Sequence, residues 1–178
     1  MSSRQIPDNP EKRTEMKKCE IREGYVPGSI GRIVEMHASY YHEHWGFGRF
    51  FEAKVAVDLA AFLERYDTSR DRFWVVLRHG RIEGSLAMDG IDAAEKGAHL
   101  RWFIVSERLR GEGVGNLLMD LGIDFCRKQG YRRVYLWTFK GLDAARHLYE
   151  KSGFRLAEAY SGKQWGKEVH EQRFELRL

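Results

Sequence analysis

The stretch SERLRGEGVGN at residues 106–116 carries three glycines and an arginine between two patterned segments. The run before it, HLRWFIV at 99–105, has the length and apolar composition of a strand, and residues 114–128 after it place apolar side chains at helical spacing. Glycines let a backbone come close to a ligand, and the first amides of a helix have no partners within that helix. This composition predicts a phosphate-binding turn, with an ordinary tight turn as the alternative.

The spacing of these glycines excludes two common nucleotide motifs. A dinucleotide fingerprint needs G-x-G-x-x-G, but its third position falls on Asn116 when counted from Gly111 and on Leu118 when counted from Gly113. A P-loop needs a lysine directly after its last glycine, and none follows here. The turn must therefore suit a different phosphate ligand.

The segments around this turn predict an α/β (α+β) domain with a central sheet. Two helices are expected before a hairpin, and strands then alternate with helices toward the C-terminal end. In numbers, we expect helices at 29–45, 49–66, 114–128 and 142–151, and strands at 19–22, 73–77, 82–88, 99–105, 133–139, 154–160 and 172–178. With 178 residues, the chain has room for one domain, at 19–178, after a flexible leader at 1–18.

Composition and charge narrow the class of protein. Two cysteines, Cys19 and Cys126, cannot form a secreted-type disulfide framework, and no Cys/His cluster has zinc spacing, so no metal is expected. No apolar run approaches the length that a membrane span needs. The net charge of +4 arises from 30 basic and 26 acidic residues that intermingle, which does not favour a nucleic-acid partner. These features predict a cytoplasmic protein that binds neither nucleic acid nor membrane.

A second signature lies downstream of the glycine turn. The R-x-x-G-x-G pattern of the turn and the segment ARHLYEKSGF at 145–154 together resemble the two signatures of the GNAT (GCN5-related) N-acetyltransferase superfamily. Two further segments, at 35–56 and 131–139, are similar to the acetyltransferase half of bacterial MarR-GNAT fusion proteins. The resemblance implies the GNAT fold, a mixed and mostly antiparallel sheet of six to seven strands with about four helices.

The same resemblance implies an activity and a cosubstrate. Members of this superfamily transfer an acetyl group from acetyl-CoA directly to a primary amine of a small molecule or peptide. A non-catalytic acyl-CoA sensor is the alternative, and a homodimer is expected by the same resemblance. The implied acetyl-CoA contacts are Phe103, Ile104 and Val105 for the pantetheine arm, and Arg110, Gly111, Glu112, Gly113, Val114, Gly115 and Asn116 for the pyrophosphate. One departure is Leu142, which stands where many members have an asparagine.

Catalytic roles follow from the resemblance and from the chemistry of the side chains. Tyr149 matches the tyrosine that protonates the departing thiolate, and a backbone amide near Val105 would stabilise the carbonyl oxygen. His99 is the candidate general base because a neutral imidazole accepts a proton near pH 7. Glu43, Glu52 and an ordered water remain alternatives for the base.

The first two expected helices carry the aromatic residues that suit an acceptor pocket. The candidate substrate contacts are Tyr41, Glu43, Trp45 and Trp137, with Tyr40 and Phe51 nearby. This set favours an amine on an apolar or aromatic body. Packing in the core is the alternative for each aromatic residue.

Overall fold

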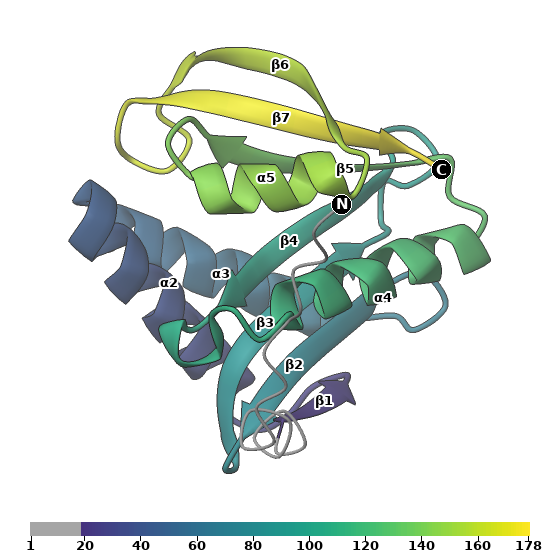
Figure 1. Ribbon diagram of the computed structural model, residues 1–178, viewed down its shortest axis with the longest axis horizontal. Coiled ribbons are helices and arrows are strands. Elements are labelled where there is room, and N and C mark those ends of the chain that lie inside the picture. Colours follow the sequence, from purple (N-terminus) through teal and green to yellow (C-terminus); the bar gives the residue numbers. More distant parts are fainter. Residues whose placement is uncertain (1–18) are drawn as a thin grey trace, which may run out of the picture.

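A seven-stranded sheet runs through residues 19–178, the part of the chain that the computed structural model describes (Figure 1). Its strand order is β1-β2-β3-β4-β5-β7-β6. The strands are β1 (Cys19–Glu23), β2 (Arg72–Arg78), β3 (Arg81–Asp89), β4 (Ala98–Val105), β5 (Arg133–Phe139), β6 (Arg155–Gly162) and β7 (Val169–Arg177). The expected leader at 1–18 lies outside the described residues.

Two pairs of helices cover the two faces of this sheet. They are α2 (Ser29–Trp45) and α3 (Arg49–Glu64) on one face, and α4 (Val114–Lys128) and α5 (Asp143–Lys151) on the other. The alternation along β2 explains both cores, because Trp74 and Val76 pack toward α4 while Phe73 and Val75 pack toward α2 and α3. A short 3-10 helix, η1 (Glu107–Leu109), precedes α4.

The α/β fold expected from the sequence is confirmed, with a mixed sheet in which all adjacent strands are antiparallel except β4 and β5. Ser29 begins α2, but its hydroxyl donates a hydrogen bond to the Val26 carbonyl at 2.6 Å instead of capping the helix. The residue before the helix is Gly28 in the left-handed region, at φ 90°, and it gives no side-chain cap.

The β4–β5 ladder is short, and this decides where the site lies. The two strands pair only at Ala98 with Val134 and at His99 with Tyr135, and β4 then runs obliquely away from β5 (Figure 1). A bulge at Trp102, whose φ is 44°, accompanies the divergence. Ser85 Oγ holds this bulge by donating to the Trp102 carbonyl at 2.6 Å. The strands therefore form a fork that opens toward the glycine turn.

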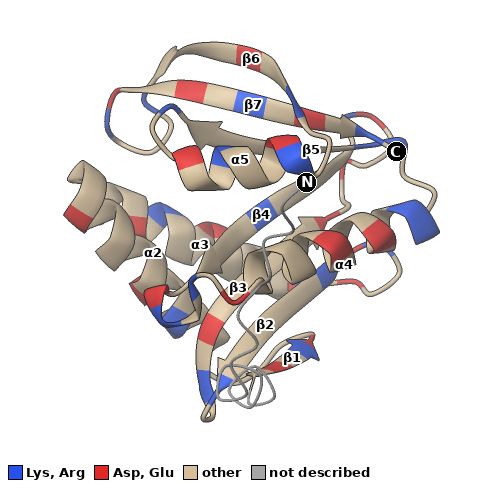
Figure 2. Cartoon of the chain, in the orientation of Figure 1, with Lys and Arg blue, Asp and Glu red and all other residues tan. Residues whose placement is uncertain are grey.

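Charges and thiols of the described part of the chain have no special grouping. Lysine and arginine alternate with aspartate and glutamate over most elements (Figure 2). Cys19 and Cys126 are both free, and burial raises the pKa of the Cys126 thiol to about 12. Among residues 19–178, no helix combines the length and apolarity that spanning a bilayer demands.

Candidate functional site

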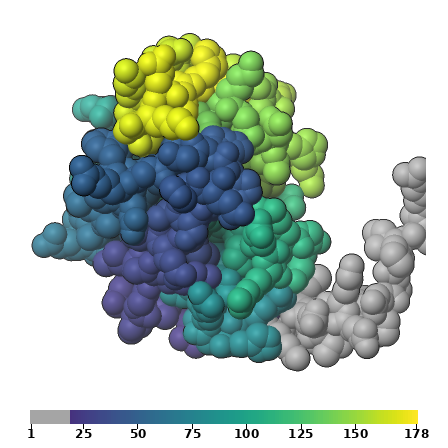
Figure 3. Space-filling model, turned by 90° about the vertical axis from the view of Figure 1, so that its left-hand side faces the viewer, coloured from purple at the N-terminus to yellow at the C-terminus, as the bar shows by residue number. Residues whose placement is uncertain are grey.

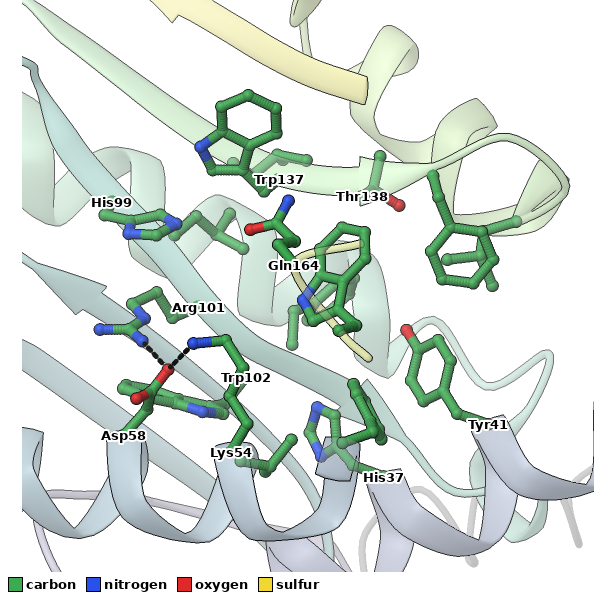
Figure 4. Close-up of a pocket in the computed structure, with 18 of the residues that line it drawn as sticks. His37, Tyr41, Lys54, Asp58, His99, Arg101, Trp102, Trp137, Thr138 and Gln164 are labelled. Atoms are coloured by element: carbon green, nitrogen blue, oxygen red, sulfur yellow. Dashed lines mark hydrogen bonds and ion pairs between the residues drawn. The ribbon is translucent and has the colours of Figure 1, made fainter. Parts of the chain in front are cut away.

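A cavity of about 340 Å³ lies at the fork between β4 and β5 (Figure 4). Helices α2 and α3 form its floor, and the loop between β6 and β7 reaches it from the opposite side. Its lining residues are His37, Tyr41, Phe51, Lys54, Val55, Asp58, His99, Leu100, Arg101, Trp102, Phe103, Leu136, Trp137, Thr138, Phe139, Leu142, Tyr149, Gln164 and Trp165. Twelve of these 19 residues are aromatic or aliphatic, histidines aside, and most of the polar groups lie along β4 and α3.

The glycine turn at the start of α4 presents unused backbone amides. Gly111 and Gly113 have φ of 77° and 80°, which L side chains rarely adopt, so glycine is required at both positions. Within the described residues, the N–H groups of Gly111 and of residues 113–116 donate no hydrogen bond. Together with the positive end of the helix dipole, these donors form a site for an anionic group.

Side chains around this turn hold it in place or remain available. Arg78 pairs with Glu112, with 2.9 Å between Nη1 and Oε1, so the Glu112 side chain anchors the turn and leaves ligand contact to its backbone. Arg110 makes an exposed ion pair with Glu107, at 3.0 Å, and its guanidinium carbon lies 5.9 Å from the centroid of the Tyr40 ring. Asn116 Oδ1 accepts a hydrogen bond from Lys151 at 3.2 Å.

Ser106 occupies the junction between β4 and the turn. Its hydroxyl is buried and has no hydrogen-bond partner among the described residues. A buried polar group without a partner is costly to the folded state, and Ser106 is not among the residues that line the cavity. The free amides of the turn, and not this hydroxyl, are the groups at the junction that suit a phosphate.

Tyr149 of α5 lies beneath the fork, close to Phe103 of β4. The two ring centroids are 6.3 Å apart, and Tyr149 is 7% exposed. Burial raises the pKa of the Tyr149 phenol, so its proton is retained at neutral pH. Its hydroxyl makes no hydrogen bond within residues 19–178, which leaves that proton available to a ligand.

Tyr41 of α2 faces the same region. Burial and then the neighbouring phenols of Tyr149 and Tyr40 raise the pKa of Tyr41. Tyr41 and Trp137 are the two predicted substrate contacts that line the cavity. Figure 4 shows the Tyr41 ring pointing into the cavity, whereas the Trp137 indole borders it and packs against Tyr160, with ring centroids 5.8 Å apart.

The other two predicted substrate contacts lie outside the cavity lining. Glu43 is exposed near the end of α2, and Trp45 packs against Phe139 with ring centroids 5.5 Å apart. Glu52, an alternative base, is also exposed and borders a separate groove between α2 and α3. The helical turn that places Tyr41 inward directs Glu43 to solvent.

His99 lines the cavity at the closed end of the fork. Burial first, and then the positive charges of Arg101 and Arg173, lower its pKa to about 3. The imidazole is therefore neutral at physiological pH. It lies four residues before Phe103 along β4, so it is nearer the acceptor side of the cavity than the glycine turn.

His37, a buried residue of α2, is a second histidine that lines the cavity. Its Nδ1 lies 2.8 Å from the Ile33 carbonyl, and because a carbonyl only accepts, Nδ1 carries the proton and Nε2 is a free acceptor. Burial lowers the pKa of His37 to about 4. A polar residue at a buried helical position was the signal that could have identified it.

Charged residues on α3 and β4 were also missed. Asp58 Oδ2 is 3.1 Å from Lys54 Nζ and 3.1 Å from Arg101 Nη2, and Arg101 Nη1 is 3.3 Å from Asp89 Oδ2 (Figure 4). The spacing of Lys54 and Asp58 indicates a shared helix face, but nothing in it indicates that this face meets β4.

Comparison with known proteins identifies a family model and several relatives. Residues 30–154 match the model described as "Acetyltransferase (GNAT) family". The N-acetyltransferase family 8 member 2 of Rattus norvegicus is 30% identical over 120 residues, which cover 65% of this chain and 53% of that protein. The probable N-acetyltransferase camello of Xenopus tropicalis is 29% identical over 132 residues, covering 74% of this chain and 60% of that protein. The chain thus spans little more than half the length of these relatives.

Solved structures share the fold. The acetyltransferase from Streptococcus agalactiae superposes with a TM-score of 0.71 at 20% identity, covering 91% of this chain and 99% of that chain. Ard1 from Thermoplasma volcanium gives a TM-score of 0.68 at 22% identity, covering 90% and 98%. At these identities the likeness establishes the architecture alone.

Proposed function

Because the chain belongs to the acetyltransferase (GNAT) family, we propose that it transfers an acetyl group from acetyl-CoA to a primary amine bound in the cavity. The observation that carries this proposal is the fork between β4 and β5, which joins the free amides before α4 to a cavity containing Tyr149 and His99. Acetyl-CoA would supply the activated acyl group as a thioester.

The glycine turn would hold the pyrophosphate. The amides of Gly111 and of residues 113–116 point to no protein acceptor, and Arg110 is free to leave its exposed pair with Glu107 for a phosphate. Along the fork, the backbone of Phe103, Ile104 and Val105 would pair with the pantetheine arm in the manner of an added strand. Leu142, in place of asparagine, offers an apolar contact only.

Three steps remain for residues of this chain. The amine would bind as the free base, because an alkylammonium with a pKa near 10 has no lone pair for attack and an imidazole with a pKa of about 3 is too weak to deprotonate it. His99 would then accept the proton that leaves the amine nitrogen once the bond to the carbonyl carbon has formed and that nitrogen is more acidic. A backbone N–H near Val105 would donate to the carbonyl oxygen as negative charge develops there. Tyr149 would then protonate the departing thiolate, a role supported by its retained proton and unpartnered hydroxyl.

The aromatic wall supports an acceptor with an apolar or aromatic body. Tyr41 and Trp137 line the cavity, and Phe139 and Trp165 extend the same wall. Glu43 and Trp45 remain predicted acceptor contacts, and from their positions they would act at the outer end of α2. The homodimer, the cytoplasmic location and the finer similarity to regulator-fused GNAT domains also remain predictions.

An acceptor screen tests the proposal. Thioester consumption is measured with acetyl-CoA and a panel of primary amines, with the wild type and Tyr149→Phe side by side. We expect turnover with at least one primary alkylamine that carries an aromatic group, and a loss of about a hundredfold in kcat for the variant. Binding of acetyl-CoA without turnover of any amine would favour the acyl-CoA sensor, and absence of binding would contradict both functions.

A further inference from the structure

The loop between β6 and β7, residues 163–168, is fastened to the junction of α2 and α3. Lys167 Nζ donates to the Trp45 carbonyl, and the Trp165 ring lies 5.7 Å from that of Phe139. A Cβ at Gly166 would overlap the ring of Phe50. The C-terminal strands and α2–α3 accordingly form a continuous surface, yellow against blue in Figure 3. The loop thus forms the wall of the cavity opposite α3.

A buried carboxylate anchors the first part of that loop. Glu171 of β7 is 1% exposed, yet no described cation lies within ion-pair distance of it. Its Oε1 accepts the backbone N–H of Gln164 at 2.9 Å, and its Oε2 accepts the Gln164 side-chain Nε2 at 2.8 Å. Gly162 leaves room for the carboxylate, because a Cβ there would overlap it. Glu171 therefore holds Gln164 by accepting hydrogen bonds from both its backbone and its side-chain N–H groups.

This arrangement fixes which way the Gln164 amide points. The carboxylate accepts hydrogen bonds, so the amide nitrogen must face Glu171 and the amide oxygen must face away from it. Gln164 lines the cavity, and Figure 4 shows its oxygen on the side where His99 lies. No described residue donates to this oxygen. It is an oriented and unused acceptor in a cavity wall.

We propose that the acceptor carries, beside the amine that is acetylated, a second N–H group that donates a hydrogen bond to the Gln164 amide oxygen. The inference rests on the proposed function and specifies its substrate class. Gln164 shares the cavity wall with Trp137 and Trp165, so an acceptor with an aromatic body that fills the cavity would exclude water from this oxygen. Leaving it unpaired would then cost free energy, which is how a site rejects an analogue that lacks the donor.

Glu171 is the positioning residue in this scheme. It has no place in the cavity lining and acts through the orientation of Gln164. Replacing the carboxylate with an amide gives Gln164 a partner that can also donate. The Gln164 amide is then free to turn its NH₂ group into the cavity.

Two matched probes test the proposal. Phenylalanine amide and phenylalanine methyl ester share the amine and the aromatic body, but only the amide offers a second N–H. For the wild type we expect kcat/KM to be at least about tenfold higher with the amide, mainly through KM. Gln164→Met should bring the ratio near one, whereas Gln129→Met, at an exposed position at the end of α4, should leave it unchanged.

Glu171→Gln separates positioning from mere stability. We expect an intermediate ratio, with the thermal midpoint of each variant measured to confirm folding.

A ratio that Gln164→Met leaves unchanged would overturn the inference while leaving acetyl transfer intact. If the wild type acetylates no amine, the proposed function fails instead, and the ratio is read from calorimetric binding of the two probes in the presence of CoA. Equal affinity there, or no binding of either probe, would overturn the inference too.

Discussion

The imidazole of His99 is stacked on the phenol ring of Tyr135, with ring centroids 4.3 Å apart and planes inclined by 15°. These two residues are also the last paired positions of the β4–β5 ladder. The stack thus marks the point where the sheet divides, and it places a candidate base at the closed end of the fork. His99 has both a structural contact and a proposed chemical role.

Two substitutions separate these roles. His99→Phe keeps an aromatic ring on Tyr135 but cannot accept a proton, whereas His99→Ala removes both functions. We expect both variants to lose about a hundredfold in kcat and to lose the acidic limb of the kcat profile that the lowered pKa of His99 places near pH 3. Recovery of activity in the phenylalanine variant, or an acidic limb retained by the alanine variant, would assign the base elsewhere, with His37 next to be tested.

Reversing the charge at Arg110 should weaken acetyl-CoA binding. Arg110→Glu places a carboxylate beside the proposed pyrophosphate site, and we expect the Kd to rise at least about tenfold in calorimetry. Arg127→Glu, at the other end of α4, is the matched control because Arg127 is equally exposed. Equal affinities for the two variants would contradict the assignment of the glycine turn.

The buried His37 should make stability depend on acid pH. Burial lowers its folded-state pKa to about 4, while the unfolded chain titrates near pH 6.5. Between these values the unfolded state binds the proton first, so the unfolding free energy falls as pH falls, by up to about 1.4 kcal/mol per pH unit.

His37→Asn should remove the His37 share of this dependence, since asparagine can donate to the Ile33 carbonyl but does not titrate, and the share of the buried His99 should remain. Urea unfolding at a series of pH values measures the effect. His79→Asn is the control, because His79 is exposed in the β2–β3 turn at φ 51°, a conformation that asparagine tolerates. Parallel pH dependence of His37→Asn and the wild type would refute the prediction.

Two glycine substitutions should shift stability in opposite directions. A Cβ at Gly90 would overlap the Arg70 carbonyl, so Gly90→Ala should lower the unfolding free energy by about 2 kcal/mol. Gly31, within α2, has open space around its Cα, so Gly31→Ala should raise it by about 0.5–1 kcal/mol. Chemical denaturation of both variants measures the two changes in unfolding free energy. Equal changes would contradict the prediction that the space around each glycine sets the effect of the added methyl group.

The sequence predicted the elements well where periodicity carried the information. The helix at 114–128 and the strand at 133–139 match α4 and β5 in their bounds, because regular burial leaves a repeating pattern. The glycine turn was located for the same reason, since its conformational demand is local. The cavity was predicted only in part. Lys54, Arg101 and Gln164 line it together because tertiary packing brings three distant segments to one place, and the spacing of residues within a segment carries no information about this packing.

The bulge at Trp102 is a second feature that sequence could not predict. A bulky residue rarely adopts a positive φ, and this one is held by Ser85 from a neighbouring strand. The extended backbone expected across 99–105 is consequently interrupted where the fork begins.

Because β4 and β5 pair at only two positions, few backbone hydrogen bonds join the two halves of the sheet. Strands β1–β4 form one half and β5, β7 and β6 form the other, each stitched internally by longer ladders. A ligand that hydrogen-bonds along the open part of β4 would complete the missing rungs and join the halves. A bound ligand would therefore make local opening between the two halves less frequent. Amide hydrogen exchange along residues 101–105 would then be slower with the ligand than without it.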